Sequence, residues 1–167
     1  MKSLYFTFFF LSICSITKLA QINVQVPVQT LPHFLFYNLD NKPFTDTDLH
    51  KGPALFIMYF DPDGDHCQRA MAFIGEHFQA FKKMQVALVS GDNESKINQF
   101  MNTYGSKVKG QKNVIILVDE LQQFNGKFNP LRYPAMYIFS SGGKLLDYDD
   151  SPESVFRMAN TINKDVK

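Results

Sequence analysis

Ala54-Leu-Phe-Ile-Met-Tyr-Phe60 is an unbroken apolar run, and it is followed by the polar segment Asp61-Pro-Asp-Gly-Asp-His66 and then by Cys67. The apolar run predicts a β-strand that is buried on both faces, as in a parallel or mixed sheet. The polar segment predicts a sharp turn, after which a helix is predicted over residues 66–84. A strand that brings a cysteine to a helix N-terminus is a recurrent redox geometry, because the helix dipole there favours a thiolate.

The predicted helix carries one apolar stripe that includes the cysteine. Its members recur at i, i+3, i+4, i+7, i+11 and i+14, and they are Cys67, Ala70, Met71, Ile74, Phe78 and Phe81. We therefore expect the sulfur of Cys67 to point toward the core. Asp63 or Asp65 is expected to cap the helix by accepting a hydrogen bond from a free N–H group of the first turn.

The composition is that of a globular protein with balanced charge. Of the 167 residues, 45% are hydrophobic and 20% are charged, and the net charge is +1. A chain of this length can form one domain with its own core. Its balanced charge indicates neither nucleic acid nor an anionic membrane as a partner.

The N-terminus has the layout of a secretory signal peptide. Lys2 is followed by an apolar run over residues 4–16, which is short for a bilayer span, and then by a more polar stretch. We predict a signal peptide at residues 1–20, a domain at 21–167, export to the periplasm or the extracellular space, and no stable membrane span after cleavage. A retained membrane anchor and lipidation at Cys14 are the alternatives, and the residue before Cys14 is larger than lipoprotein signals prefer.

Strands and helices alternate along the rest of the predicted chain. Strands are predicted at 22–28, 32–37, 43–45, 85–90, 113–119, 133–139 and 144–148. Helical segments are predicted at 45–49, 91–104 and 120–124, and a last helix starts at Pro152. This order, closed by a hairpin at Ser140-Ser-Gly-Gly143 and a helix, predicts an α/β protein with a three-layer α/β/α fold and a central mixed sheet.

From Pro32 to the C-terminus, the chain resembles the redoxins of the thioredoxin-like superfamily, close to the secreted thiol–disulfide oxidoreductases and peroxiredoxin-like (AhpC/TSA-like) proteins. Residues 38–53 resemble the leading hairpin and short helix of that family, and residues 56–67 resemble its central strand and active-site turn. Tyr133-Pro134 resembles the cis-proline site, and residues 141–144 resemble the hairpin that follows. The resemblance implies the thioredoxin-like fold and a role in cell redox homeostasis.

The sequence departs from the family at the residues that carry the chemistry. The family motif is Cys-x-x-Cys, and here Gly64 stands at the first, nucleophilic position while Cys67 stands at the second, resolving position. Dithiol exchange needs two sulfurs, because the second releases the substrate from the mixed disulfide. We therefore expect a noncatalytic protein- or peptide-binding module in thiol/redox or envelope processes. The alternative is a monothiol disulfide oxidoreductase that uses Cys67 together with an external resolving thiol.

The candidate site combines the degenerate turn with the proline loop. Gly64, Asp65 and His66 form the turn, and Tyr133 and Pro134 are expected to bind an extended segment of a protein or peptide partner, including one that carries a thiol. For Pro134, the simpler interpretation is that it begins a strand. His66 is expected to be an exposed residue at the helix start, and the alternative is that it lies beside the thiol and lowers the pKa of that thiol. No cofactor is predicted.

Peroxidase and metal-binding interpretations are disfavoured by the spacing. The peroxiredoxin pattern Pro-x-x-x-Thr/Ser-x-x-Cys would place Phe60 at the proline and Gly64 at the hydroxyl. Residues 61–65 resemble the start of a calcium loop, but the sixth position is His66 where glycine is required, and the twelfth is Ala72 where glutamate is required. The histidines are too scattered to indicate a zinc site with Cys67. We therefore predict no metal.

Overall fold

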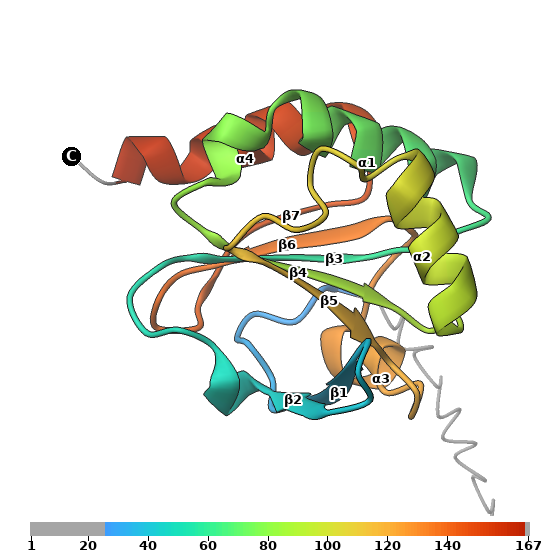
Figure 1. Ribbon diagram of the computed structural model, residues 1–167. Helices are drawn as coiled ribbons and strands as arrows, with labels where there is room; N and C mark the ends of the chain where they lie inside the picture. Colours follow the sequence, from blue (N-terminus) through green and yellow to red (C-terminus); the bar gives the residue numbers. More distant parts are fainter. Residues whose placement is uncertain (1–25, 166–167) are drawn as a thin grey trace, which may run out of the picture.

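A mixed sheet of seven strands forms the centre of the computed structural model, which describes residues 26–165 (Figure 1). The strands are β1 (Leu35–Asn38), β2 (Pro43–Thr45), β3 (Leu55–Tyr59), β4 (Gln85–Ser90), β5 (Val114–Val118), β6 (Ala135–Phe139) and β7 (Leu145–Asp149). Their order across the sheet is β2-β1-β5-β4-β3-β6-β7. β3, β4 and β5 are parallel to one another, whereas β1, β2, β6 and β7 pair antiparallel with their neighbours. The predicted signal peptide lies outside the described residues.

Helices cover both faces of this sheet. They are α1 (Asp65–Glu76), α2 (Glu94–Thr103), α3 (Phe124–Phe128) and α4 (Val155–Asp165), with 3₁₀ turns η1 (Asp46–Asp48), η2 (Phe78–Phe81) and η3 (Pro152–Ser154). α1, α2 and α4 lie on one face, and the short helix α3 lies on the other (Figure 1). The predicted α/β class and three-layer arrangement are therefore confirmed. None of the helices in the described part of the chain is long and apolar enough to cross a membrane.

β3 lies inside the sheet and is buried on both faces, as its continuous apolar character predicts. Phe56 and Met58 belong to the core beneath α1, α2 and α4, whereas Leu55 and Ile57 belong to the core on the α3 side. The second core is built largely from aromatic rings. The rings of Phe124 and Phe128, for example, stack with their centroids 4.2 Å apart. At about 25 cal/mol per Å² of buried apolar area, these two cores supply the main stabilisation of the fold.

The predicted long helix after the turn is interrupted. α1 ends at Glu76, and a separate 3₁₀ turn, η2, follows His77, whose backbone leaves the helical region at φ −109° and ψ 20°. Gly75, a poor helix former, lies two residues before His77. All six members of the predicted stripe are nevertheless buried in the core beneath the helices.

Two further local predictions are wrong. The described part of the predicted strand at 22–28 is not a strand, and this segment is held by Val28, whose N–H donates to the Phe128 carbonyl. The short helix predicted at 120–124 begins at Phe124 instead. Gln122 has a positive φ of 51°, and the buried Asp119 carboxylate accepts hydrogen bonds from the N–H groups of Gln123 and Phe124. The side chain of Asp119 thus holds a turn where a helix was expected.

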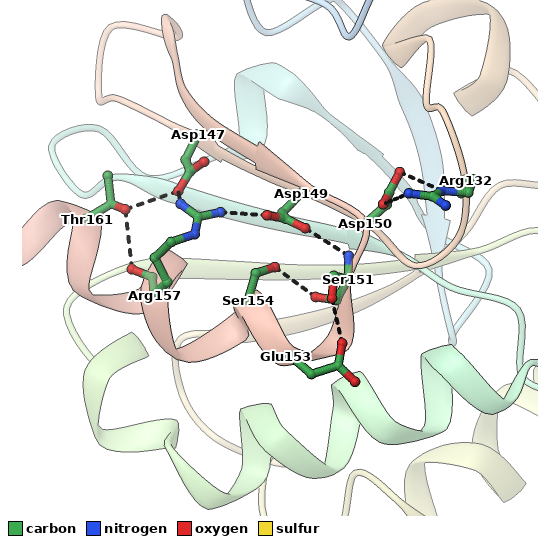
Figure 2. A network of polar contacts seen from close by, with 9 residues as sticks. All are labelled: Arg132, Asp147, Asp149, Asp150, Ser151, Glu153, Ser154, Arg157 and Thr161. Atoms are coloured by element: carbon green, nitrogen blue, oxygen red, sulfur yellow. Dashed lines mark hydrogen bonds and ion pairs between the residues drawn. The ribbon is translucent and has the colours of Figure 1, made fainter.

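A polar network fastens α4 to β7 (Figure 2). The guanidinium of Arg157 on α4 contacts Asp147 and, at 2.7 Å, Asp149, which are both on β7. Burial acts to raise the pKa of Asp149, but the N–H of Ser151 and the Arg157 guanidinium outweigh it and hold that pKa below its usual value. Near the cis-proline loop, Arg132 pairs with Asp150 at 2.8 Å. The strand at this edge of the sheet is therefore fixed by side chains as well as by its backbone ladder.

Replacement of Arg157 with alanine is expected to lower the free energy of unfolding by about 1–2 kcal/mol, because two partly buried carboxylates lose their partner while the exposed arginine itself is screened by water. The depressed pKa of Asp149 adds stability above its unfolded pKa, and this contribution is lost as the pH falls through the folded value. The loss of stability in acid should therefore be shallower in the variant. Urea unfolding across the acid range measures both effects. Arg69→Ala, which removes an exposed arginine that hydrogen-bonds to His66 and forms no ion pair within residues 26–165, is the control, and an equal cost in both variants would contradict the prediction.

Candidate functional site

The turn after β3 brings Cys67 into the first turn of α1. The carbonyl of Asp61 accepts a hydrogen bond from the N–H of Gly64 at 3.1 Å, and the carbonyl of Gly64 in turn accepts from Gln68 at 3.0 Å. Gly64 is the N-cap residue, and no side chain caps this helix, so the prediction of an Asp63 or Asp65 cap is wrong. The carboxylate of Asp63 instead pairs with Lys96 of α2 at 2.6 Å. Asp65 is the first helical residue, and its charge is favourable near the helix N-terminus.

The Cys67 thiol is buried and its pKa is high. Only 1% of the residue is exposed, and its Sγ accepts a hydrogen bond of 3.4 Å from the N–H of Asp61. Burial raises the pKa of this thiol to about 11, against a smaller lowering effect of the Asp61 N–H. The predicted inward orientation is confirmed. A thiol in this state is a poor nucleophile near neutral pH, because the reactive species is the thiolate.

Gly64 occupies a position at which a cysteine side chain would fit. Its backbone lies at φ −82° and ψ 119°, which any L-residue can adopt, so glycine is not required there for conformational reasons. A Cβ atom at this position would lie 3.6 Å from the Sγ of Cys67. The residue is also partly exposed, whereas Cys67 is buried. This geometry fits an exposed first position and a buried second position of a two-thiol turn, with the first side chain missing.

The proline loop lies beside this turn. The Tyr133–Pro134 peptide bond is cis, which is the state that the resemblance implies. Tyr59 of β3 pairs with Ala135 of β6 in antiparallel register, so the residues just after Tyr59 run alongside those just before Ala135. Burial raises the pKa of the Tyr133 phenol, and the negative charges of Asp119 and Asp61 contribute to the same shift. The structure therefore brings the predicted turn and the predicted loop together.

Two residues that sequence reasoning missed support Tyr133. Its ring lies 5.0 Å from the ring of Tyr59, and its hydroxyl donates a hydrogen bond to the side-chain carbonyl of Asn125 on α3. Burial, followed by the charge of Asp119, raises the pKa of Tyr59 to about 12. A signal for Tyr59 was present in its place at the carboxyl end of a central strand, where sites of α/β proteins gather. No pattern in the sequence marked Asn125.

The remaining turn residues are exposed. His66 lies at the helix start as expected, and its Nδ1 atom is 3.1 Å from a guanidinium nitrogen of Arg69, with which it forms a hydrogen bond. This contact turns the imidazole toward the helix surface, which gives no support to the alternative in which His66 lowers the thiol pKa. Within residues 26–165, no group of three His, Cys, Asp or Glu side chains is arranged to hold a metal ion.

Comparison with known proteins shows the family of this chain. The profile of the AhpC/TSA family matches residues 23–147. The chain belongs to the AhpC/TSA family. Thiol-disulfide oxidoreductase ResA from Bacillus thuringiensis (strain Al Hakam) and that from Bacillus anthracis are each 22% identical over 119 residues, or 70% of this chain. The match spans 65% of the length of each of these curated relatives.

Solved structures establish the thioredoxin-like fold of this AhpC/TSA chain. The thioredoxin domain of a thiol-disulfide oxidoreductase from Bacteroides vulgatus has a TM-score of 0.66 at 16% identity, covering 85% of this chain and 99% of that domain. A secreted disulfide oxidoreductase from Mycobacterium tuberculosis has a TM-score of 0.63 at 15% identity, covering 78% and 95% of the two chains. The redoxin resemblance is thus confirmed. This AhpC/TSA protein is a thioredoxin-like redoxin with glycine at position 64, in the turn between β3 and α1.

Proposed function

We propose that this protein is an exported, noncatalytic binding module, which holds a protein or peptide partner at the Gly64–Cys67 turn and the Pro134 loop. The observation that carries the proposal is the burial of Cys67, whose pKa is raised to about 11, opposite a glycine. Dithiol–disulfide exchange would require a second cysteine at the turn. The other cysteine of the chain, Cys14, belongs to the predicted signal peptide. The thioredoxin-like scaffold remains, and its cis-proline loop can bind a partner without the nucleophile.

The Tyr133 segment supports binding of an extended partner. Within the part of the chain that the structure describes, no hydrogen bond is formed by the backbone N–H or carbonyl of Tyr133. The residue is 37% exposed, and its ring is held in place by Tyr59 and Asn125. A free backbone pair beside a fixed aromatic ring suits recognition by strand addition, in which main-chain hydrogen bonds give affinity and side-chain contacts give specificity.

Export is part of the same proposal. Its support is the layout of the first twenty residues, together with the similarity to a structure described as a secreted disulfide oxidoreductase. Cell fractionation followed by N-terminal sequencing tests it. A processed N-terminus at Gln21 in the exported fraction is the expected result, and an unprocessed chain in the cytoplasm would contradict it.

Native Cys67 is expected to react slowly with maleimide near neutral pH. With a pKa of about 11, its thiolate fraction should still rise about tenfold per pH unit at a pH where an ordinary cysteine, with a pKa of about 8.5, has levelled off. Mass spectrometry of the native protein against pH measures this. The control is Ser141→Cys in a Cys67→Ala background, which places a thiol on an exposed hairpin. Fast native labelling of Cys67 below neutral pH would favour the monothiol enzyme instead.

Turnover is the second test of this proposal. The purified protein is expected not to accelerate the reduction of insulin disulfides by dithiothreitol. Acceleration that disappears in Cys67→Ser would establish the monothiol alternative, in which dithiothreitol resolves the mixed disulfide on Cys67.

A further inference from the structure

A pocket lies at the opposite end of the sheet from the turn and the cis-proline loop. It has a volume of about 400 Å³ and opens where β3, β4 and β5 begin, whereas the Gly64–Cys67 turn follows the end of β3. At about 3.3 Å per residue, the two ends of β3 are about 13 Å apart. The volume falls within the range of about 300–1,000 Å³ that small-molecule sites occupy. Nothing in the function proposed above uses this pocket.

The pocket exists because β1 covers only part of β5. β1 pairs with β5 at two positions, through Leu117 and Val118, so the first half of β5 has no paired strand on that side within the described residues. The opening is lined by Val114 and Ile115 of β5, Phe44 of β2 and Leu49 of the segment after η1. Phe44, Leu49 and Ile115 lie on the α3 side of the sheet and form an apolar floor, whereas Val114 lies on the other face, and all four are only partly buried.

The rim of this pocket is cationic. Lys82, Lys83 and Lys112 line it, and none of the three side chains is in an ion pair or a hydrogen bond with another described residue. Asp48 also lines the pocket, but its carboxylate is bound by the N–H and hydroxyl of Thr45, each at 2.8 Å. The rim therefore presents an excess of unpaired positive charge above an apolar floor.

Two amide side chains hold the walls in place. Gln85 accepts a hydrogen bond from the N–H of His50 at 2.9 Å and donates one to its carbonyl at 2.7 Å, which fixes the loop before β3. Asn113 donates to the carbonyls of Phe81 at 3.0 Å and Met84 at 2.9 Å, which fixes the loop that carries the two adjacent lysines. The pocket is thus formed before any ligand arrives, which lowers the entropy lost on binding.

We propose that this pocket binds a free, monomeric amphiphile that carries one carboxylate on a short apolar chain, such as a medium-chain fatty acid. The carboxylate lies among the three lysines, and the chain covers the apolar floor. The charge of the rim and the apolar floor together indicate the class of ligand. The unpaired lysines attract an anion. The apolar floor is stabilised by burying an apolar chain, which a simple inorganic anion does not have. The site depends on neither Cys67 nor the cis-proline loop.

Titration of the purified protein with decanoate below its micelle concentration tests this, read by calorimetry and by amide chemical shifts. Saturable binding at one site is expected, with the largest shifts at Leu49, Val114 and Ile115. Decyltrimethylammonium, which has the same chain and the opposite charge, should not bind there. The triple variant Lys82→Gln/Lys83→Gln/Lys112→Gln should weaken decanoate binding by about tenfold or more, since three partly screened charge interactions are lost together.

A triple variant elsewhere on the surface, Lys42→Gln/Lys109→Gln/Lys144→Gln, has the same net charge and should retain the affinity. Equal weakening in both triple variants would mean a non-specific charge effect and would overturn the proposal. So would shifts that map away from β5, or binding to phosphatidylglycerol vesicles without binding of free decanoate. Shifts at the pocket that depend on protein concentration alone would indicate a second copy of the chain as the occupant, which also overturns it. Decanoate binding by a protein that does not reduce insulin would support this proposal, because the pocket is independent of the Gly64–Cys67 turn.

Discussion

Replacement of Gly64 with cysteine is expected to create an internal disulfide between positions 64 and 67 on oxidation. The backbone of Gly64 is already in a conformation open to L-residues, and the nearest atom to a Cβ built there, the carbonyl oxygen of Asp61, is at 3.4 Å. The same Cβ would lie 3.6 Å from the Sγ of Cys67, so a sulfur carried on it comes within reach of the Cys67 thiol once the two side chains rotate. The new side chain therefore needs no backbone movement.

The variant should also gain dithiol chemistry. The cysteine at position 64 would be partly exposed at the N-terminus of α1, where the helix dipole stabilises its thiolate for attack on a substrate disulfide. Cys67 would then attack the mixed disulfide, releasing the reduced substrate and leaving a 64–67 disulfide for dithiothreitol to reduce. We expect acceleration of insulin reduction by about tenfold or more over the wild-type chain, because the resolving thiol removes the trapped intermediate.

Gly142→Cys is the matched control, since it adds a thiol at an exposed glycine of the β6–β7 hairpin. It should form no internal disulfide with Cys67 and should not accelerate insulin reduction. Peptide mapping by mass spectrometry after oxidation identifies the bridge. A folded Gly64→Cys protein that forms no 64–67 disulfide would contradict the placement of the nucleophile position at Gly64.

The periodicity of the sequence predicted the elements whose burial is continuous. β4 lies at the predicted residues 85–90, and β3 falls within its predicted range. The 3.6-residue repeat also predicted the burial of Cys67, because every position of that stripe packs on the sheet. These features depend on which face of a helix or strand is buried, and the spacing of the apolar residues in the sequence identifies that face.

Features decided by one tertiary contact could not be predicted in this way. The sequence predicts that Asp119 ends a strand, and only the fold shows that its carboxylate accepts hydrogen bonds from the N–H groups at the start of α3. Asp63 was expected to cap α1, but Lys96 lies within 2.6 Å of it across the gap between two helices. In both cases a polar side chain had several possible local partners, and the arrangement of distant elements selected among them. The contact between Asn125 and Tyr133 is of the same kind.

Phe124→Ala is expected to lower the free energy of unfolding by about 3–5 kcal/mol, the usual cost of removing a fully buried phenylalanine. Its ring is 4.2 Å from that of Phe128 and 4.4 Å from that of Tyr59, so its loss leaves a cavity between α3 and the sheet. The cavity also removes the support beneath Tyr59, on which Tyr133 rests. Urea unfolding measures the stability. Maleimide labelling of Cys67 in the folded variant should be faster than in the wild type, because local opening becomes less costly.

Phe156→Ala is the matched control, because this phenylalanine is 54% exposed on α4 and contacts the ring of His77. Its loss should cost about 1 kcal/mol or less and should leave the labelling rate unchanged. A similar small cost for Phe124→Ala would mean that the aromatic cluster on the α3 side adds little to stability. A large cost with no change in labelling would mean that the cluster stabilises the fold without controlling access to the site. A large cost with faster labelling would connect the core on the α3 side to the buried thiol, through Tyr59 and the cis-proline loop.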